Sequence, residues 1–308
     1  MLVTMRSPFI TRFAPSPTGR LHLGHAFSAI VAAELARRTG GRWLLRIEDI
    51  DASRCRPELE EAIHADLAWL GLTPDGVMVQ SARMPAYKTA LDDLREKGLL
   101  YPCFCTRADI ARAAAAPHAG ETLPYPGTCR GRPIDETELA ARPHGWRLDL
   151  AATGLAVEQQ WLDVAQDMQQ GRADAAGDPV LARKDAPVSY HLACVLDDAA
   201  QGVTVVTRGA DLIDATPLQR LLQTLLGLPA PAYAHHPLLT DANGRRLAKR
   251  DDAASVAAMR EAGMDARALH MRLLAQAEEF LLAVTDVKPD TDRMTGARPP
   301  SLPGGSRK

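Results

Sequence analysis

The chain has 308 residues, of which 46% are hydrophobic and 24% are charged, and its formal net charge is -2. This length corresponds to about two domains, and the composition is typical of a globular protein and argues against wholesale disorder. No stretch approaches the ~20 apolar residues of a membrane helix, and the first residues lack the apolar run of a signal peptide. Five cysteines do not suggest a secreted disulfide framework. We therefore expect a cytoplasmic protein that meets any nucleic acid through a local basic patch.

The first part of the chain alternates strands and helices. Residues 8–14 are extended, 15–19 form a Pro/Gly turn, and apolar residues recur at helical spacing over 25–38. Residues 43–47 then read as a buried strand, and Pro57 opens a second helix. Strand, helix, strand and helix in this order predict an α/β fold with a parallel sheet.

The second part of the chain differs in composition from the first. Cysteines, prolines and glycines cluster over 101–160, which indicates an inserted subdomain. Residues 189–196 and 202–207 read as strands, whereas 218–226 and 266–284 read as helices. The end of the chain is rich in Pro, Gly, Arg and Asp, which predicts disorder. The division we expect is a first catalytic half over 8–100, the insert over 101–160, a second catalytic half over 161–240, a loop and short helical C-terminal part over 241–287, and a tail over 288–308.

The most informative segment is Arg12-Phe-Ala-Pro-Ser-Pro-Thr-Gly19, followed by His22-Leu-Gly-His25. It places two histidines and Gly24 at the start of a helix, where unpaired N–H groups and a partial positive charge favour a polyphosphate. Two imidazoles could donate to charge developing on a transferring phosphoryl group. Taken alone, the histidine pair is more typical of a turn with two surface histidines, and a zinc pair there would lack a nearby acidic or cysteine ligand.

These residues carry a resemblance. His22-Leu-Gly-His25 resembles the HIGH signature of class I aminoacyl-tRNA synthetases, and the octapeptide before it resembles the glutamyl/glutaminyl branch of that class. The resemblance covers about residues 8 to 255. It implies a Rossmann-like catalytic sheet and binding of ATP, with Mg²⁺, by His22, Gly24 and His25.

The same resemblance suggests a glutamate site. Glu48 follows a predicted strand, at the sheet edge where open α/β sheets bind ligands, and its carboxylate can hold an ammonium group. Tyr190 and Arg208 match positions that bind the amino acid in the family, and Ala14 and Ser16 belong to the N-terminal motif. Arg12 and Arg208 supply two guanidinium forks for an amino acid with two carboxylates.

Arg245-Arg-Leu-Ala-Lys249-Arg resembles a degenerate KMSKS loop. The match implies that Lys249 steadies ATP phosphates in the transition state, with Arg246 in place of the first lysine. Ala248 and Arg250 replace the serines of the family pattern. A run of cations is by itself more typical of a solvated face or a nucleic-acid contact.

Cys103, Cys105 and Cys129 form the other group that carries chemistry. Thiolates at this spacing can bind one structural zinc ion and rigidify a loop-rich insert. The glutamyl-queuosine branch of the family pairs three such cysteines with a tyrosine, here Tyr125, as the fourth ligand. His118 is the alternative ligand, and three free thiols are the alternative to a metal site.

The resemblance also predicts the reaction. Only residues 250–308 follow Lys249, which is too little for the helical anticodon-reading domains of a glutamyl-tRNA synthetase. We therefore expect the shortened glutamyl-queuosine branch, which activates glutamate with ATP without tRNA and transfers it to the queuosine base at the wobble position of tRNA(Asp). The expected RNA partner is the anticodon stem-loop. The alternatives are a truncated glutamyl-tRNA synthetase that charges a 3′ end and an inactive tRNA-binding paralogue.

Overall fold

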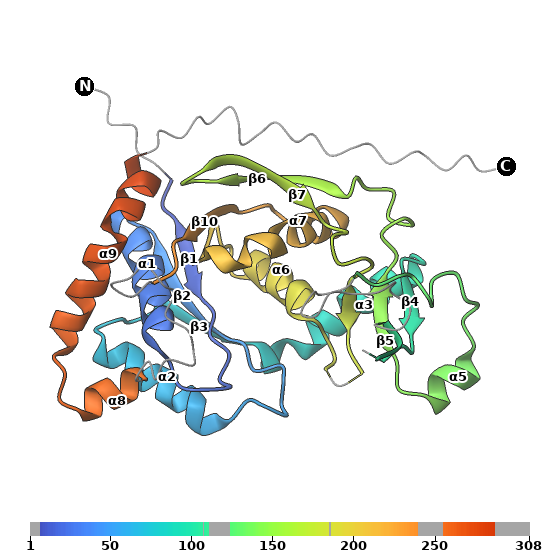
Figure 1. Cartoon of the computed structure of the whole chain (residues 1–308), viewed down its shortest axis with the longest axis horizontal. Helices are drawn as coiled ribbons and strands as arrows, with labels where there is room; N and C mark the ends of the chain where they lie inside the picture. The colour runs from blue at the N-terminus through green and yellow to red at the C-terminus, as the bar shows by residue number, and fades with distance from the viewer. Residues whose placement is uncertain (1–6, 107, 111–123, 185, 240–254, 287–308) are drawn as a thin grey trace.

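The computed structural model describes residues 7–106, 108–110, 124–184, 186–239 and 255–286. Its first sheet contains three parallel strands in the order β1 (Ile10–Phe13), β2 (Arg42–Ile47) and β3 (Gly76–Val79). Helix α1 (Leu23–Thr39) connects β1 to β2, and α2 (Pro57–Trp69) lies between β2 and β3 along the chain (Figure 1). Gly40 ends α1 at φ 66°, a left-handed conformation that glycine adopts without a Cβ penalty. The predicted strand–helix–strand start is confirmed.

A second sheet has the order β7-β6-β10-β9. Its strands are β6 (Glu158–Asp163), β7 (Asp167–Arg172), β9 (Val205–Gly209) and β10 (Ala232–His236), and β10 runs parallel to both β6 and β9. The two sheets meet where the backbone N–H of Thr204, just before β9, donates to the carbonyl of Ile10 in β1 over 2.9 Å. Parallel strands from distant parts of the sequence are thereby brought side by side.

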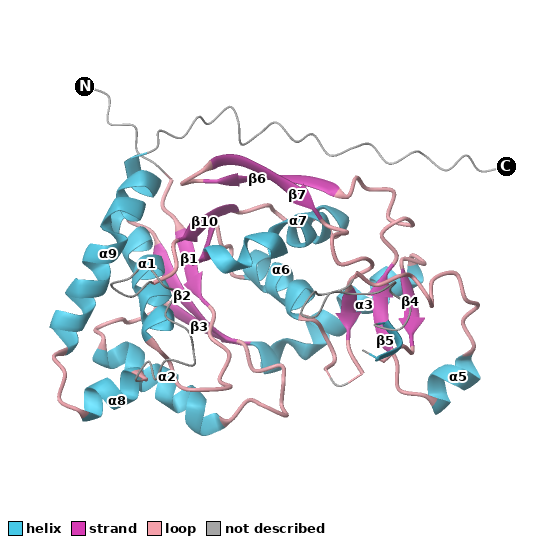
Figure 2. Cartoon of the chain, viewed as in Figure 1, coloured by secondary structure: helices cyan, strands magenta, loops and turns pink. Residues whose placement is uncertain are grey.

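A third, antiparallel sheet lies at the far end of the molecule (Figure 2). It pairs β4 (Leu100–Cys103) with β5 (Gly145–Leu148) and β5 with β8 (Val180–Ala182). The short helix α5 (Glu136–Ala141) lies at the same end. The Cys- and Pro-rich stretch of the sequence is thus built around this small sheet.

The remaining helices of the described residues are α3 (Met84–Glu96), α6 (Tyr190–Ala200), α7 (Thr216–Leu225), α8 (Val256–Glu261) and α9 (Ala266–Asp286). Short 3-10 helices span Gln80–Arg83 and Ala210–Ala215. Helices α8 and α9 lie at the end of the molecule opposite to β4 and β5 (Figure 1). Within the described residues, no helix combines the length and the apolar character needed to cross a bilayer.

The largest core packs α1 between the first sheet and α9. Phe27 and Ile30 of α1 are buried with Leu45 of β2 and with Leu273 and Leu281 of α9. Burying side chains of this size stabilises the fold by roughly 1.5–3 kcal/mol each. This packing fixes the start of α1 relative to the ends of the neighbouring strands.

One predicted element is wrong. Residues 189–196 were expected to form a strand, but Tyr190 begins helix α6. The Ser189 side chain caps this helix by accepting the backbone N–H of Leu192 over 3.4 Å. A short, continuous apolar run fits a buried helix as well as a buried strand, so its periodicity could not separate the two. The predicted helices near 218–226 and 266–284 are confirmed as α7 and α9.

Candidate active site

A cavity of about 800 Å³ opens where β1, β2, β9 and β10 end and α1 and α6 begin. This is the carboxyl edge of parallel strands, where open α/β sheets bind their ligands. Its lining includes every predicted glutamate- and ATP-site residue of the described chain, namely Arg12, Ala14, Ser16, His22, Gly24, His25, Glu48, Tyr190 and Arg208. The structure thus brings together side chains from five separate stretches of the sequence.

His22 and His25 are organised by the start of α1. Nδ1 of His22 accepts the backbone N–H of Gly24 over 3.1 Å, and Nδ1 of His25 accepts the backbone N–H of His22 over 3.3 Å. The two rings stack with centroids 3.7 Å apart. Because Nδ1 is the acceptor in both neutral rings, each carries its proton on Nε2. The pair therefore places two imidazole rings at a helix N-terminus, a position that suits phosphate oxygens.

Arg12 takes part in a buried charge network. Its Nε donates to Asp198 Oδ1 over 2.9 Å, and Arg46 donates to the same oxygen over 2.6 Å. Arg46 also donates to Glu48 Oε1 from Nη2, over 3.2 Å. Burial acts to raise the pKa of Asp198, but Arg12 and Arg46 outweigh it and hold that pKa below its ordinary value. The two residues predicted to contact glutamate, Arg12 and Glu48, are thus linked through Asp198 and Arg46.

Two opposing effects act on the pKa of the Glu48 carboxyl. Burial raises its pKa, and the charges of Arg46 and Arg12 oppose that rise without cancelling it. Tyr190, at the first turn of α6, keeps 37% of its surface exposed and also lines the cavity. A carboxylate and a phenol oxygen on one wall can accept hydrogen bonds from an ammonium group.

The charge of the cavity wall favours a substrate with a net negative charge. Among the described residues, three arginines, Arg12, Arg20 and Arg208, and two carboxylates, Glu48 and Asp211, line the cavity, so one positive charge is in excess. A free glutamate molecule carries one net negative charge at neutral pH, with two carboxylates and one ammonium group. The negative charge of such a substrate would neutralise the excess positive charge of the cavity wall.

Four contributors to this site were missed in the sequence. Arg46 and Asp198 were not among the predicted site residues. Thr207 Oγ1 and His236 Nε2 line the cavity, are buried, and have no hydrogen-bond partner in the described part of the chain. No local pattern marks these two residues, because only the pairing of β9 with β10 brings them to the same edge.

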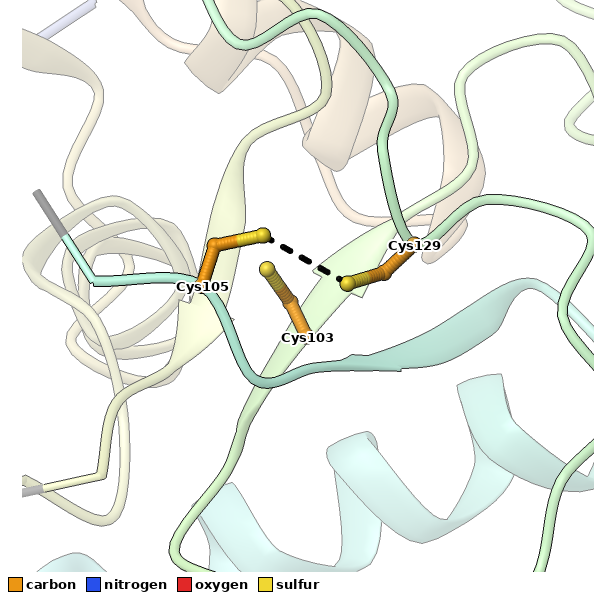
Figure 3. A group of neighbouring side chains, drawn as sticks. All are labelled: Cys103, Cys105 and Cys129. Atoms are coloured by element: carbon orange, nitrogen blue, oxygen red, sulfur yellow. Dashed lines mark hydrogen bonds between the residues drawn. The ribbon is translucent and has the colours of Figure 1, made fainter. Parts of the chain in front are cut away.

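The three cysteines of the insert also come together. The Sγ atoms of Cys103, Cys105 and Cys129 lie within 4.8 Å of one another, and they point toward a common centre (Figure 3). Cys105 and Cys129 Sγ are 3.5 Å apart. The hydroxyl of Tyr125 lies 3.6 Å from Cys103 Sγ and accepts the backbone N–H of Cys129 over 2.8 Å.

This group can be tested against the geometry of zinc. Tetrahedral coordination with Zn–S of ~2.3 Å and Zn–O of ~2.0 Å requires S···S separations of ~3.8 Å and S···O separations of ~3.5 Å. The separations between Cys105 and Cys129 and between Tyr125 and Cys103 are close to these values. These two separations are compatible with one tetrahedral ion, and the three sulfur atoms are close enough together to bind a metal.

Some predicted residues cannot be placed. The alternative zinc ligand His118 and the cations of the KMSKS-like loop, Arg245, Arg246, Lys249 and Arg250, lie outside the described residues, as does the predicted tail over 288–308. Ser255, the first described residue after that loop, lines the cavity. It caps α8 by accepting the backbone N–H of Ala258 over 3.1 Å.

The fold and the site define a class of enzyme. Residues 8–276 match the family of class I tRNA synthetases (E and Q), catalytic domain, and the chain belongs to this family. The parallel α/β sheet and the HIGH-like helix start are the features that the resemblance predicted, so the predicted class is confirmed.

Comparison with individual members of this family gives a narrower similarity. A protein of Rhodobacter capsulatus named glutamyl-Q tRNA(Asp) synthetase is 51% identical over 268 residues, which cover 82% of this chain and 95% of the relative. A protein of Thiobacillus denitrificans with the same name is 43% identical, over 95% of this chain and 90% of the relative. A solved glutamate tRNA ligase of Elizabethkingia meningosepticum superimposes with a TM-score of 0.67 at 28% identity. That comparison covers 80% of this chain but only 53% of the solved one.

Proposed function

We propose that this protein activates L-glutamate with ATP to glutamyl-adenylate without tRNA and then transfers glutamate to the queuosine base at the wobble position of tRNA(Asp). One observation carries the first half of the proposal. A single cavity combines a helix N-terminus bearing two imidazole donors with two buried arginines and a carboxylate. The names of the relatives support the second half, in which tRNA(Asp) is the acceptor of glutamate.

In this proposal, Arg12 and Arg208 bind the two carboxylates of glutamate. Both guanidinium groups are buried and line the cavity, and planar forks of this kind match carboxylates in bidentate geometry. Glu48 and Tyr190 surround the ammonium group, and the Ala14–Ser16 turn closes the same wall. An amino acid with an uncharged side chain would leave one arginine without an anion.

ATP would lie across His22, Gly24 and His25, with Mg²⁺ on its phosphates. The glutamate α-carboxylate attacks the α-phosphorus, the bond to the β-phosphate oxygen breaks, and pyrophosphate leaves toward Lys249 and Arg246. The two imidazoles donate to the charge that develops on the transferring group. The residues act by positioning the reactants and stabilising charge, so no side-chain nucleophile is needed.

The cysteine group would hold one structural zinc ion through Cys103, Cys105, Cys129 and Tyr125. Among the described residues, few apolar side chains surround this group. Its buried cluster consists of Cys103, Tyr125, Cys129 and Tyr101, with Cys105 and Ile110 partly buried against it. A metal would therefore replace a hydrophobic core in this part of the fold. The role is structural, because these residues do not line the cavity.

The proposed RNA partner is the anticodon stem-loop, with Arg245, Arg246, Lys249 and Arg250 as candidate phosphate contacts. Single-stranded loops present splayed bases that a protein can capture directly. Binding should weaken with salt, with a log–log slope of about -0.7 for each phosphate neutralised on a single strand.

Two assays test the proposal in sequence. Glutamate-dependent pyrophosphate exchange without tRNA tests the activation. Transfer of radiolabelled glutamate is then compared between tRNA(Asp) with queuosine, tRNA(Asp) with guanosine at that position, and a short anticodon stem-loop with queuosine. We expect label on both queuosine-bearing RNAs and none on the other.

A matched control removes the terminal adenosine from the queuosine-bearing tRNA(Asp). If the ester forms on queuosine, the trimmed RNA accepts glutamate as well as the intact RNA. Label that disappears on trimming, or that nuclease mapping places on the 3′-terminal adenosine, would instead identify a glutamyl-tRNA synthetase. Binding of glutamate and ATP without pyrophosphate exchange would identify an inactive RNA-binding paralogue.

A further inference from the structure

Arg208 is held in a way that differs from Arg12. Its Nε donates to His235 Nε2 over 3.1 Å, its Nη1 to Gln219 Oε1 over 2.7 Å, and its Nη2 to Thr216 Oγ1 over 2.7 Å. All three acceptors are neutral side chains. Among the described residues, no carboxylate lies within 4.0 Å of this guanidinium, whereas Arg12 is paired with Asp198. Within the described part of the chain, Arg208 therefore brings to the cavity wall a charge that has no ion-pair partner.

The contacts also leave part of the guanidinium for a ligand. An arginine has five N–H donors, and three of those of Arg208 are used by His235, Gln219 and Thr216. The two that remain are one on each terminal nitrogen. A buried guanidinium that, among the described residues, has two donors left and no carboxylate partner favours a charged carboxylate over a neutral amide.

The contact with His235 fixes which ring nitrogen carries the proton. Arg208 Nε can only donate, so His235 Nε2 must accept and the neutral ring must be protonated at Nδ1. That Nδ1 lies 2.6 Å from Asp163 Oδ2, and both side chains are fully buried. Asp163 is itself held, because its Oδ1 accepts the backbone N–H of Ala165 over 3.0 Å.

The fold explains why these three residues meet. Asp163 ends β6, His235 lies in the adjacent β10, and Arg208 lies in β9 on the other side of β10. His235 and Arg208 are direct partners in the β10–β9 ladder. The Tyr233 ring stacks parallel to that of His235 at 5.8 Å and lies 5.3 Å from the Arg208 guanidinium carbon. The relative positions of Asp163, His235 and Arg208 are therefore fixed by strand register and not by flexible loops.

We propose that the buried Asp163–His235 pair positions Arg208 and thereby sets the preference for a substrate carboxylate over an amide. The proposal rests on the proposed function, since it takes Arg208 as a carboxylate contact. Asp163 and His235 are positioning residues that do not line the cavity. Asp163 holds His235 in the tautomer that accepts from Arg208, and Arg208 then keeps its place at the cavity.

The central variant is Asp163→Asn. Asp163 Oδ1 accepts the backbone N–H of Ala165, and Oδ2 accepts both the ring Nδ1–H and, over 3.3 Å, the backbone N–H of His235. An asparagine must therefore turn its NH₂ toward the donor of Ala165 or toward those of His235. Facing His235, it favours the Nε2–H tautomer, which points a donor at Arg208. We expect KM for glutamate to rise roughly tenfold or more, with a smaller change in kcat and in KM for ATP, as when ground-state binding is lost. The preference for glutamate over glutamine in pyrophosphate exchange should fall as well.

A second pair of variants separates positioning from packing. In His235→Gln, the amide can accept from Arg208 and donate to Asp163, so we expect KM for glutamate close to that of the wild type. His235→Leu fills the site without an acceptor, so its KM should rise as in Asp163→Asn. Asp178→Asn is the matched control, because Asp178 is also buried and hydrogen-bonded but lies away from the cavity. It should lower the melting temperature without raising KM for glutamate.

A spectroscopic measurement tests the proposal without any activity. In protein labelled with ¹⁵N at histidine, long-range ¹H–¹⁵N spectra distinguish the two neutral tautomers, and loss of one signal in His235→Gln assigns His235. We expect Nδ1–H in the wild type and Nε2–H in Asp163→Asn. Nε2–H in the wild type, or unchanged KM for glutamate in folded Asp163→Asn that shows Nε2–H at His235, would overturn the proposal. If Asp163→Asn keeps Nδ1–H at His235, an unchanged KM for glutamate is the result expected, and a raised KM would overturn the role of the tautomer. Absence of glutamate-dependent exchange in the wild type would overturn the proposed function alone, because the tautomer would still report on Arg208.

Discussion

Arg12 Nε lies 2.9 Å from Asp198 Oδ1, and the two residues are separated by 185 positions of intervening chain in distinct parts of the fold, β1 and the end of α6. Both side chains are buried, with 4% and 5% of their surface exposed. A buried charge is tolerated only when a partner compensates it. The pair therefore ties the first strand to α6 at the wall of the cavity.

Asp198→Asn should destabilise the fold at neutral pH by about 3–5 kcal/mol, because it leaves Arg12 and Arg46 without their shared anion. The pKa of Asp198 is lowered in the folded state, so its contribution is complete above the unfolded pKa of about 3.9 and is lost as pH falls toward the folded value. The free energy of unfolding, measured in urea over a pH series, should thus differ most at neutral pH. A difference between variant and wild type that stays constant into acid would contradict this.

Arg12→Ala should nearly abolish activation of glutamate and leave ATP binding measurable. Removing one partner of a buried charge contact costs on the order of 2–5 kcal/mol, and this loss applies to the glutamate complex. kcat/KM for glutamate in pyrophosphate exchange is the measurement. Arg172→Ala is the matched control, since Arg172 at the end of β7 is exposed and forms a surface ion pair with Asp174. An unchanged kcat/KM in Arg12→Ala would remove Arg12 from the site.

Gly24→Ala should separate stability from activity. Alanine favours a helix over glycine by as much as ~1 kcal/mol, so α1 should not be weakened. A Cβ at position 24, however, would lie 3.0 Å from His22 Cε1 and 3.2 Å from Nδ1, so the imidazole must move. We expect an unchanged or higher melting temperature together with a raised KM for ATP. A normal KM for ATP would show that the position of His22 is not critical.

The zinc site predicts about one zinc ion per chain by elemental analysis of protein purified without chelator. Less than a tenth of that amount would refute the site. Cys129→Ala should lose the ion, and Tyr125→Phe should release it at lower chelator concentration, because the hydroxyl supplies the fourth ligand. His118→Ala should behave as the wild type. If His118→Ala releases the ion more easily and Tyr125→Phe retains it as the wild type does, His118 is the fourth ligand.

Several features of this protein could be read directly from its sequence. The helix over Leu23–Thr39 and the strand over Arg42–Ile47 follow from apolar spacing and from the glycine that ends the helix, which are local properties. The HIGH-like residues lie in one continuous stretch, so their placement at a helix start was also predictable. The three cysteines were recognisable as a group because sulfur ligands are few and distinctive.

Other features depended on how distant segments pack. Residues 189–196 form a helix because Ser189 caps it and its apolar side is buried against other elements, neither of which its periodicity could reveal. Asp198 belongs to the site because α6 packs beside Arg12 and Arg46, and the sequence does not show this packing. Asp163 and His235 meet because β6, β10 and β9 are neighbours, an order that differs from their order in the chain. The sequence by itself determined which groups could carry the chemistry, and the tertiary structure decided which charges face one another, because that depends on strand order and burial.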